Sequence, residues 1–387
     1  MTKTEQTSTA SRIPPETAGG LLHIDLAALA ANWRTLRDNA GGTEASAVVK
    51  ADAYGTGIEQ AVPALHRAGC RTFFVAHLSE AIRVRKVAPD ATVYVLNGLF
   101  PGTCSAYAEH SLRPVLGSFE EIEEWASFCR SQGRKHEAAI HVDTGMNRLG
   151  LTVAQGLTLR DRAELKDFET ALLMSHFVSA EESDNPLNIR QIESFKAVRE
   201  TLPGVRASLA NSSGIFLKEK PHFDLVRPGY ALYGGNPTPD RDNPMKGVAS
   251  LEARIVQLRW VEESETVGYN ARWLALGRRR IATLSIGYAD GYPRSASARG
   301  KSGEELLAGQ AIVAGRLCPF AGNVSMDLIT IDVTEIPDGE IKRGDTVTMI
   351  GGSLTVDEVG RRAGTIGYEI LTSLGRRYAR SYTESRG

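Results

Sequence analysis

Lys50 stands where an apolar run ends, and its position suggests the chemistry of a reactive amine. The run at residues 45–49 predicts a buried strand, and a glycine-containing turn with Tyr54 follows it. At the inner end of a buried strand, loss of solvation lowers the pKa of a lysine and frees its amine. A free amine is what Schiff-base catalysis requires. The alternative is a lysine whose long side chain reaches from the strand end to water.

Other polar groups lie at the ends of later apolar runs. They include Arg148, His176, and the segments 211–214 and 227–230. In the two segments, the backbone N–H groups of Ser213, Gly229 and Tyr230 and the hydroxyl of Ser212 would together bind an anion. An ordinary helix cap is the alternative explanation of the Asn-Ser-Ser-Gly segment. If these strand ends meet at the mouth of a barrel, a lysine on one side and a phosphate site on the other would form a pocket for pyridoxal phosphate.

A barrel would bring these groups together, because the C-terminal ends of barrel strands meet at one face. Eight apolar runs predict the strands, at residues 45–49, 72–76, 92–96, 112–116, 138–142, 171–177, 206–210 and 224–226. Helix-like segments separate them, at residues 58–68, 79–86, 119–132, 156–165 and 188–201. Ser79 and Ser118 are the expected N-caps, and Gly69 and Gly133 the expected C-caps. The fold class is therefore α/β, a (β/α)8 TIM-type barrel, with an open sheet of fewer strands as the alternative.

After about residue 248 the pattern changes to short β runs separated by turn residues. These runs lie at 250–261, 280–287, 310–314, 328–333 and 345–350, and one short helix is expected at 356–362. They predict a mainly β C-terminal domain. The expected division is a flexible tail at residues 1–19, a barrel at 20–247 and a β domain at 248–387. A strand expected at 21–25 fits either domain.

Composition excludes several classes of protein. The chain is 42% hydrophobic and 24% charged, which is ordinary for a globular protein, and its net charge of -1 attracts neither nucleic acid nor an acidic membrane. No apolar run reaches the length of a membrane span. The four cysteines lie far apart, which argues against a zinc site and a disulfide scaffold and indicates a reducing compartment. With no secretory signal visible, we expect a cytoplasmic protein without a metal site.

The chain resembles the alanine racemase family in a series of short segments. In order, they are VKADAYG at 49–55, VDTGMNRLG at 142–150, SHF at 175–177, ANS at 210–212, VRPG at 226–229, IGYADG at 286–291, SMD at 325–327 and IGYE at 366–369. Each segment alone is weak, but together they are specific and cover the chain from about residue 20 to 385.

The resemblance implies a barrel followed by a β domain, and a homodimer in which each active site takes residues from the partner's β domain. Lys50 would bind the cofactor, pyridoxal 5'-phosphate, as a Schiff base. The other cofactor-binding residues implied are Tyr54, Ser212, Gly229, Tyr230 and Tyr368 at the phosphate, Arg227 at the pyridine nitrogen, His176 beside the ring, and Asn211. Arg148, helped by the backbone of Met326 of the partner chain, would bind the substrate carboxylate.

Racemisation requires a proton to leave Cα from one face and return on the other, so two bases are expected. The resemblance assigns these roles to Lys50 and to Tyr288 of the partner chain. A tyrosine with a pKa of about 10 is a poor base near neutral pH, so we expect a positive charge or a hydrogen bond at its oxygen. Arg227 does not give up its proton, so it leaves the pyridine nitrogen neutral and favours reprotonation over transamination.

Two positions depart from the family pattern. Many members carry a lysine at the position of His141, and in some of them that lysine is a carbamate that orients the substrate-binding arginine. His141 forms no such stable carbamate, so an anion, a water or another acid is expected to position Arg148. Asp52 stands where many members have asparagine.

Other functions compatible with the motifs differ in chemistry. A broad-specificity racemase acting on serine or basic amino acids keeps the same machinery and changes the pocket. A decarboxylase on the same scaffold would place a carboxylate where Arg227 stands. A non-enzymatic pyridoxal-phosphate carrier would consist of the barrel alone and would have no use for a second base at Tyr288.

Overall fold

The computed structural model describes residues 13–303 and 307–384, and its contacts divide the chain into two units. One unit is Ala27–Lys246, and the other joins Met1–Leu26 to Gly247–Gly387. The first unit carries the parallel strands and the second is mainly β, as the sequence predicts. The β unit therefore includes residues that precede the barrel unit in the sequence and residues that follow it.

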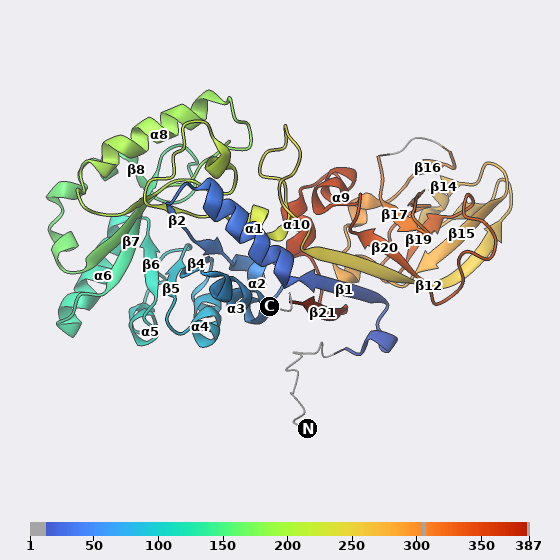
Figure 1. Cartoon of the computed structure of the whole chain (residues 1–387), viewed down its shortest axis with the longest axis horizontal. Coiled ribbons are helices and arrows are strands. Elements are labelled where there is room, and N and C mark those ends of the chain that lie inside the picture. The colour runs from blue at the N-terminus through green and yellow to red at the C-terminus, as the bar shows by residue number, and fades with distance from the viewer. Residues whose placement is uncertain (1–12, 304–306, 385–387) are drawn as a thin grey trace, which may run out of the picture. The chain divides into compact units, whose positions relative to one another are not determined.

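Parallel strands form the centre of the first unit, and one lies at each of the eight predicted runs (Figure 1). They are β2 (Glu44–Ala45) with β3 (Ala47–Val48), β4 (Thr72–Val75), β5 (Thr92–Val95), β6 (Arg113–Leu116), β7 (Glu137–Asp143), β9 (Glu169–Met174), β10 (Ala207–Ser208) and β11 (Leu225–Val226). A short strand, β8 (Leu151–Thr152), pairs with β7. Phe73 and Phe74 on β4 are completely buried, as expected of a parallel strand covered on both faces.

The sheet closes on itself through its last strand. Hydrogen-bonded neighbours run in the order β10-β9-β7-β6-β5-β4-β3, and β11 pairs with β2 in parallel. The other edge of β11 is joined to the seventh run, because the N–H of Asp224 donates to the Ala207 carbonyl and that of Arg227 to the Ala210 carbonyl, both at 2.9 Å. The predicted (β/α)8 barrel is thereby confirmed, and the ends of its strands meet at one face.

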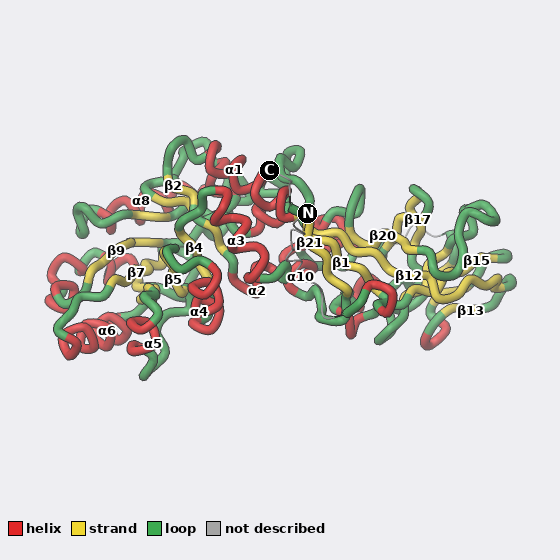
Figure 2. Tube along the Cα trace, turned by 60° about the horizontal axis from the view of Figure 1, so that its bottom comes forward, coloured by secondary structure: helices red, strands yellow, loops and turns green. Residues whose placement is uncertain are grey.

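Helices follow most of the barrel strands, and Figure 2 shows α4, α5 and α6 flanking them. They are α1 (Leu26–Asn39), α2 (Lys50–Tyr54), α3 (Ile58–Ala68), α4 (Leu78–Val87), α5 (Cys104–Glu109), α6 (Phe119–Gln132), α7 (Val153–Gly156) and α8 (Pro186–Arg199). The Ser118 hydroxyl caps α6 by accepting the N–H of Glu121, and Gly69 and Gly133 end α3 and α6 in the left-handed conformation. These three caps confirm the predictions.

Two local predictions are wrong. Ser79 lies inside α4, because the helix begins at Leu78 and the Glu80 carboxylate accepts the N–H groups of Ala76 and His77 in place of a serine cap. No helix spans residues 156–165, since α7 ends at Gly156 and two 3-10 turns, Leu159–Asp161 and Ala163–Lys166, follow. Gly156 packs closely here, because an added Cβ would lie 2.9 Å from Val198.

The β unit contains a sheet with the order β18-β17-β20-β12-β1-β21, in which β15 also pairs with β12 and β19 pairs with β15. Its strands are β1 (Gly20–Asp25), β12 (Ala249–Val261), β15 (Arg279–Leu284), β17 (Gln310–Val313), β18 (Arg316–Pro319), β19 (Ile329–Asp332), β20 (Thr346–Ile350) and β21 (Ala379–Thr383). A second small sheet holds β13 (Thr266–Val267), β14 (Trp273–Leu274) and β16 (Gly300–Lys301). Helices α9 (Val356–Arg362) and α10 (Gly367–Thr372) precede the last strand.

Strand β1 belongs to this β unit. It pairs antiparallel with β12 and parallel with β21, and these strands lie side by side in Figure 2. Its inward side chains Leu22 and Ile24 are completely buried. The expected barrel range of 20–247 therefore needs correction at its start, because residues 20–26 fall in the other unit.

Candidate active site

Lys50 opens a helical turn of unusual hand at the end of the first barrel strand. The four residues from Ala51 to Tyr54 have φ between 52° and 56°, although none is glycine. Left-handed backbone costs roughly 1–2 kcal/mol for each residue with a side chain. Such strain persists only where the surroundings hold it, and it concentrates at functional sites.

Two carboxylates hold this turn. The Glu80 carboxylate accepts the N–H of Asp52 at 3.1 Å, which joins the turn to the start of α4. The Asp52 carboxylate accepts the N–H of Ile58 at 3.1 Å and pairs with Arg83 at 2.5 Å. The negative charge of Asp52 is therefore paired with a guanidinium. Glu80 and Arg83 escaped the sequence analysis because nothing along the chain marks contacts between neighbouring strand ends.

The amine of Lys50 is easier to deprotonate than a lysine in water. Burial lowers its pKa, the positive charge of Arg148 lowers it further, and Glu80 acts in the opposite direction. These shifts are those expected of a nucleophilic lysine.

A polar cradle lies at the ends of the last two barrel strands. The Ser212 hydroxyl accepts the N–H of Gly229 at 3.0 Å and that of Ala231 at 3.3 Å. A Cβ at Gly229 would lie only 2.7 Å from the Tyr54 hydroxyl oxygen, so glycine is needed for the approach. The structure thus brings together three of the predicted phosphate-binding groups, and Tyr230 follows them at the start of a 3-10 turn, Tyr230–Tyr233.

Two neighbouring residues support this cradle. The ring of Tyr54 stacks on Tyr233, with centroids 4.6 Å apart. The Asn211 side-chain oxygen accepts the N–H of Gly214 at 2.9 Å, which is the capping bond named above as the alternative for this segment. Asn211 therefore shapes the turn that presents Ser212.

Arg227 is 3% exposed, and every partner of its guanidinium is electrically neutral. It donates to the Ser208 hydroxyl and to the carbonyl oxygens of Ser175 and Leu209. Within the part of the chain that the structure describes, no carboxylate pairs with it and its Nε has no hydrogen-bond partner. Burial lowers the pKa of Arg227 to about 9, which leaves it charged at neutral pH. A buried cation without a carboxylate partner is costly, so this guanidinium is available to interact with a bound group.

Two histidines near this guanidinium are neutral. Burial, followed by the charge of Arg227, lowers the pKa of His141 to about 4 and that of His176 well below its ordinary value. Both imidazoles lie within the electrostatic reach of Arg148 as well. The barrel mouth therefore combines uncharged rings with two guanidiniums and a lysine.

Acidification should destabilise the fold, because His141 is neutral in it. In the unfolded chain His141 takes up its proton near pH 6.5, whereas in the fold its pKa is about 4. The unfolded state binds more protons in this window, so the stabilisation present above pH 6.5 is lost as the pH falls toward 4. We expect the free energy of unfolding to fall by about 1–3 kcal/mol more than in His141→Asn, after allowance for partial exposure of the ring. Urea unfolding at several pH values measures it, and parallel pH profiles would contradict it.

Arg148 lies in a loop that one carboxylate organises. Asp143, at the end of β7, accepts the N–H groups of Gly145 and Met146 at 2.7 Å and that of Arg148 at 3.2 Å. The Arg148 guanidinium is exposed and has no partner among the described residues. Asp143 is thus an acid that positions Arg148 through its backbone, although not through its guanidinium. The sequence analysis missed this role, although an Asp two residues before a Gly is a recognised turn signal.

The β unit brings two other predicted residues together. Tyr288 begins a 3-10 turn, Tyr288–Asp290, and its N–H donates to the Ser325 carbonyl at 3.0 Å. The next N–H, of Ala289, donates to the Met326 carbonyl at 3.0 Å. The side chains of Tyr288 and Met326 are 41% and 53% exposed. The described residues of this one chain give the Tyr288 hydroxyl no partner, so the charge or hydrogen bond expected at its oxygen is not found within the chain. Tyr368 lies on α10.

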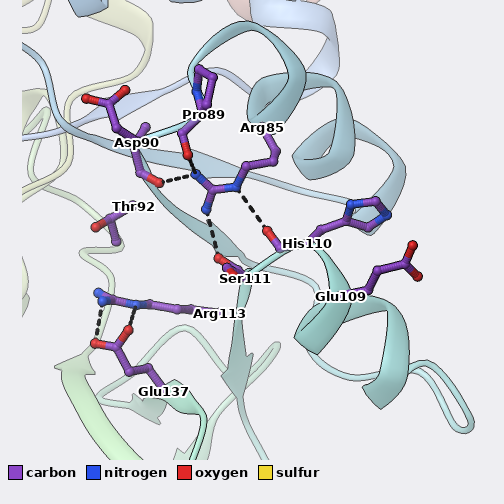
Figure 3. A pocket seen from close by; sticks show the side chains of 10 residues that line it. Arg85, Pro89, Asp90, Thr92, Glu109, His110, Ser111, Arg113 and Glu137 are labelled. Carbon is purple, nitrogen blue, oxygen red and sulfur yellow. Dashed lines mark hydrogen bonds and ion pairs between the residues drawn. The ribbon is translucent and has the colours of Figure 1, made fainter.

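A separate hollow lies at the opposite ends of the barrel strands and is not suited to catalysis. It measures about 410 Å³ and lies where β5, β6 and β7 begin (Figure 3). Arg85 donates to four surrounding carbonyl oxygens, of Pro89, Ala91, His110 and Ser111, at 2.6 to 2.9 Å. Arg113 is paired with Glu137. Because its cations are satisfied, this face serves stability.

In the described ranges 13–303 and 307–384, no helix has the length and apolar character to cross a membrane. Within the same ranges, no group of three or more His, Cys, Asp or Glu side chains is arranged to hold a metal ion.

Comparison with known proteins agrees with the geometry. Residues 24–237 match the family described as "Alanine racemase, N-terminal domain", and residues 248–382 match "Alanine racemase, C-terminal domain". The chain is 57% identical over 366 residues to the alanine racemase of Methylobacterium sp. (strain 4-46), covering 95% of this chain and 98% of that one. It is 44% identical over 369 residues to that of Rhizobium meliloti, covering 94% and 97%.

Solved structures give the same result. A crystal structure of alanine racemase from Bartonella henselae with covalently bound pyridoxal phosphate is 39% identical, with a TM-score of 0.88, and the match covers 95% of this chain and 100% of that one. Alanine racemase from Streptomyces coelicolor is 30% identical, with a TM-score of 0.87 and coverage of 96% and 99%.

Proposed function

This chain belongs to the alanine racemase family of pyridoxal-phosphate-dependent enzymes, and we propose that it interconverts L-alanine and D-alanine by a two-base mechanism. One base is Lys50, and the other is Tyr288 of a partner subunit. The β domain matched at residues 248–382 also argues against a carrier made of the barrel alone.

The observation that carries this proposal is the buried, unpaired guanidinium of Arg227. A pocket for a protonated pyridine ring would place a carboxylate there, and none of the residues described does so. A neutral pyridine nitrogen is an acceptor that suits the free Nε of Arg227. The neighbouring cradle of Ser212, Gly229 and Tyr54 suits a phosphate, and Lys50 suits the covalent attachment. These residues therefore fit pyridoxal 5'-phosphate.

When bound, the cofactor withdraws electrons from the substrate and makes its Cα proton more acidic. The remaining work falls to the chain itself. Arg148, exposed and without a partner among the described residues, binds the substrate carboxylate and fixes which hydrogen faces each base. Lys50, with its lowered pKa, takes or returns the proton on one face, and Tyr288 of the partner subunit acts on the other. Arg227 limits the electron withdrawal, so prompt return of a proton is favoured over transamination.

We propose a homodimer because the β unit leaves functional and apolar side chains uncovered. Tyr288, Met326, Leu328 and Ile366 are between 41% and 62% exposed in the single chain. Apolar side chains at such exposure favour a covering surface, and a second copy of the chain supplies one. The cytoplasm remains our proposal for the compartment, supported by four buried cysteines without disulfides.

A racemisation assay across a panel of L- and D-amino acids tests the function. We expect alanine to be turned over at least about tenfold faster, as kcat/KM, than serine, lysine or arginine, since one side-chain group in a pocket discriminates by about 10–200-fold. Comparable rates for serine or a basic amino acid would establish the broad-specificity alternative. Release of carbon dioxide together with the corresponding amine, without formation of the opposite enantiomer, would establish a decarboxylase instead.

A further inference from the structure

A buried carboxylate fastens the turn that carries Tyr288. Asp290 is 4% exposed, and one of its oxygens accepts the N–H of Gly287 at 2.8 Å. The other oxygen lies 3.1 Å from Nε of Arg377. The carbonyl of Asp290 also accepts the N–H of Gly375 at 2.9 Å. The turn is thereby tied to the segment that precedes β21.

The same guanidinium reaches the loop that carries Met326. Its Nη1 donates to the Asp327 carboxylate at 2.8 Å. The two loops already touch through their backbones, and there is no room to spare, since a Cβ at Gly287 would lie 2.3 Å from the Ser325 carbonyl oxygen. Arg377 therefore bridges two carboxylates. Asp290 lies two residues after Tyr288, and Asp327 directly follows Met326.

The bridge matters because of where its two ends lie. An ion pair in water contributes little, and the Arg377–Asp327 end is half exposed. The Asp290 end is buried, and removing its cation would leave a carboxylate uncompensated. Burial raises the pKa of Asp290, and the Gly287 N–H and the charge of Arg377 oppose that shift. Without Arg377, the Asp290 carboxylate would have to take up a proton, or the turn would have to open to water. Since the Tyr288 side chain is itself exposed, this turn determines where its hydroxyl lies.

We infer that Arg377 is a positioning residue for the second base, holding the Tyr288 turn against the Met326 loop through Asp290 and Asp327. The inference rests on the proposed function of Tyr288. It assigns Arg377 no contact with substrate, so its effect should appear only in the proton transfer that Tyr288 performs.

The test is the exchange of the alanine Cα hydrogen with deuterium in D2O, followed by NMR for each enantiomer with the holoenzyme. The hydrogen that faces Lys50 exchanges through Lys50, and the one that faces Tyr288 exchanges through Tyr288. We expect Arg377→Ala to slow the Tyr288-dependent exchange about 10- to 100-fold, because a small misplacement of a reacting group has effects of that size. Exchange through Lys50 and the affinity for pyridoxal phosphate should stay within about twofold.

Arg376→Ala is the matched control. This arginine is adjacent in the sequence and exposed, and it has no hydrogen bond or ion pair among the described residues. It should leave both exchanges unchanged. Should Arg377→Ala unfold, Asp327→Asn breaks only the exposed arm and should give the same one-sided loss, in smaller measure.

Each outcome separates the positioning role from the proposed function. If Tyr288→Phe leaves both exchanges intact, the second-base assignment fails and the inference fails with it. If Tyr288→Phe abolishes one exchange while the folded Arg377 and Asp327 variants keep both, the positioning role alone is overturned. Equal loss of both exchanges in those variants would show a merely structural role and would also overturn it.

Discussion

Lys50→Ala should lower racemisation by at least about 10⁴-fold, because it removes one of the two bases and the amine that attaches the cofactor. The substitution should not disturb the turn, since Lys50 is not among the residues with positive φ. Purified enzyme should be yellow, with the visible absorption of a protonated Schiff base, and the variant should lose this band. Absorption spectroscopy and the racemisation assay measure the two effects.

Lys86→Ala provides the control for this experiment. Lys86 lies exposed on α4 in the same unit and should keep both colour and activity when replaced. An unchanged absorption band in Lys50→Ala would rule out the attachment of the cofactor to this residue, whatever the activity shows.

Tyr288→Phe should slow racemisation by about 10²–10⁴-fold while leaving cofactor binding unchanged, because it removes a base and little else. Two enantiomers have equal free energies, so kcat/KM falls equally in both directions and cannot identify the missing base. Exchange of the Cα hydrogen with deuterium can identify the missing base. We expect one enantiomer to keep exchanging through Lys50 without inverting, and the other to stop exchanging.

Tyr269→Phe is a suitable control, since Tyr269 is 72% exposed in the same unit. Loss of exchange from both enantiomers in Tyr288→Phe, or loss of the cofactor with it, would contradict the two-base scheme.

Mixing the two inactive variants tests whether the site is shared between subunits. In a mixed dimer of Lys50→Ala and Tyr288→Phe chains, one site would combine both defects and the other would have neither. Random reassembly makes half of the dimers mixed, so about a quarter of wild-type activity should return. A site contained within one chain would recover nothing, because each chain would still carry one defect.

Much of this architecture was predictable because its signals are local. The ends of α3, α6 and α9 agree with the sequence analysis, since glycine or an N-capping hydroxyl marks them. The barrel strands were recognisable from their continuous apolar runs. The helix predicted at residues 156–165 is wrong because a helix-like composition continues past Gly156, where α7 ends and 3-10 turns follow.

The positioning residues were much harder to foresee. Glu80 and Arg377 act on turns far away in the sequence, and charged side chains of this kind are ordinary at a surface. The left-handed turn after Lys50 was equally hidden, because three of its four residues are alanine or tyrosine, which rarely adopt positive φ. Reactive groups can therefore be recognised by type and spacing, whereas the residues that hold them depend on tertiary contacts.

The pairing of β1 between β12 and β21 has a consequence for synthesis and for dissection of the chain. The β unit cannot complete its sheet until residue 383 has left the ribosome, although β1, which lies between two later strands, is made first. The barrel emerges in between and can fold while β1 waits without its neighbours. A fragment cut at residue 248 would lack β1 and would expose the edges of β12 and β21, so the β unit is not a separable module.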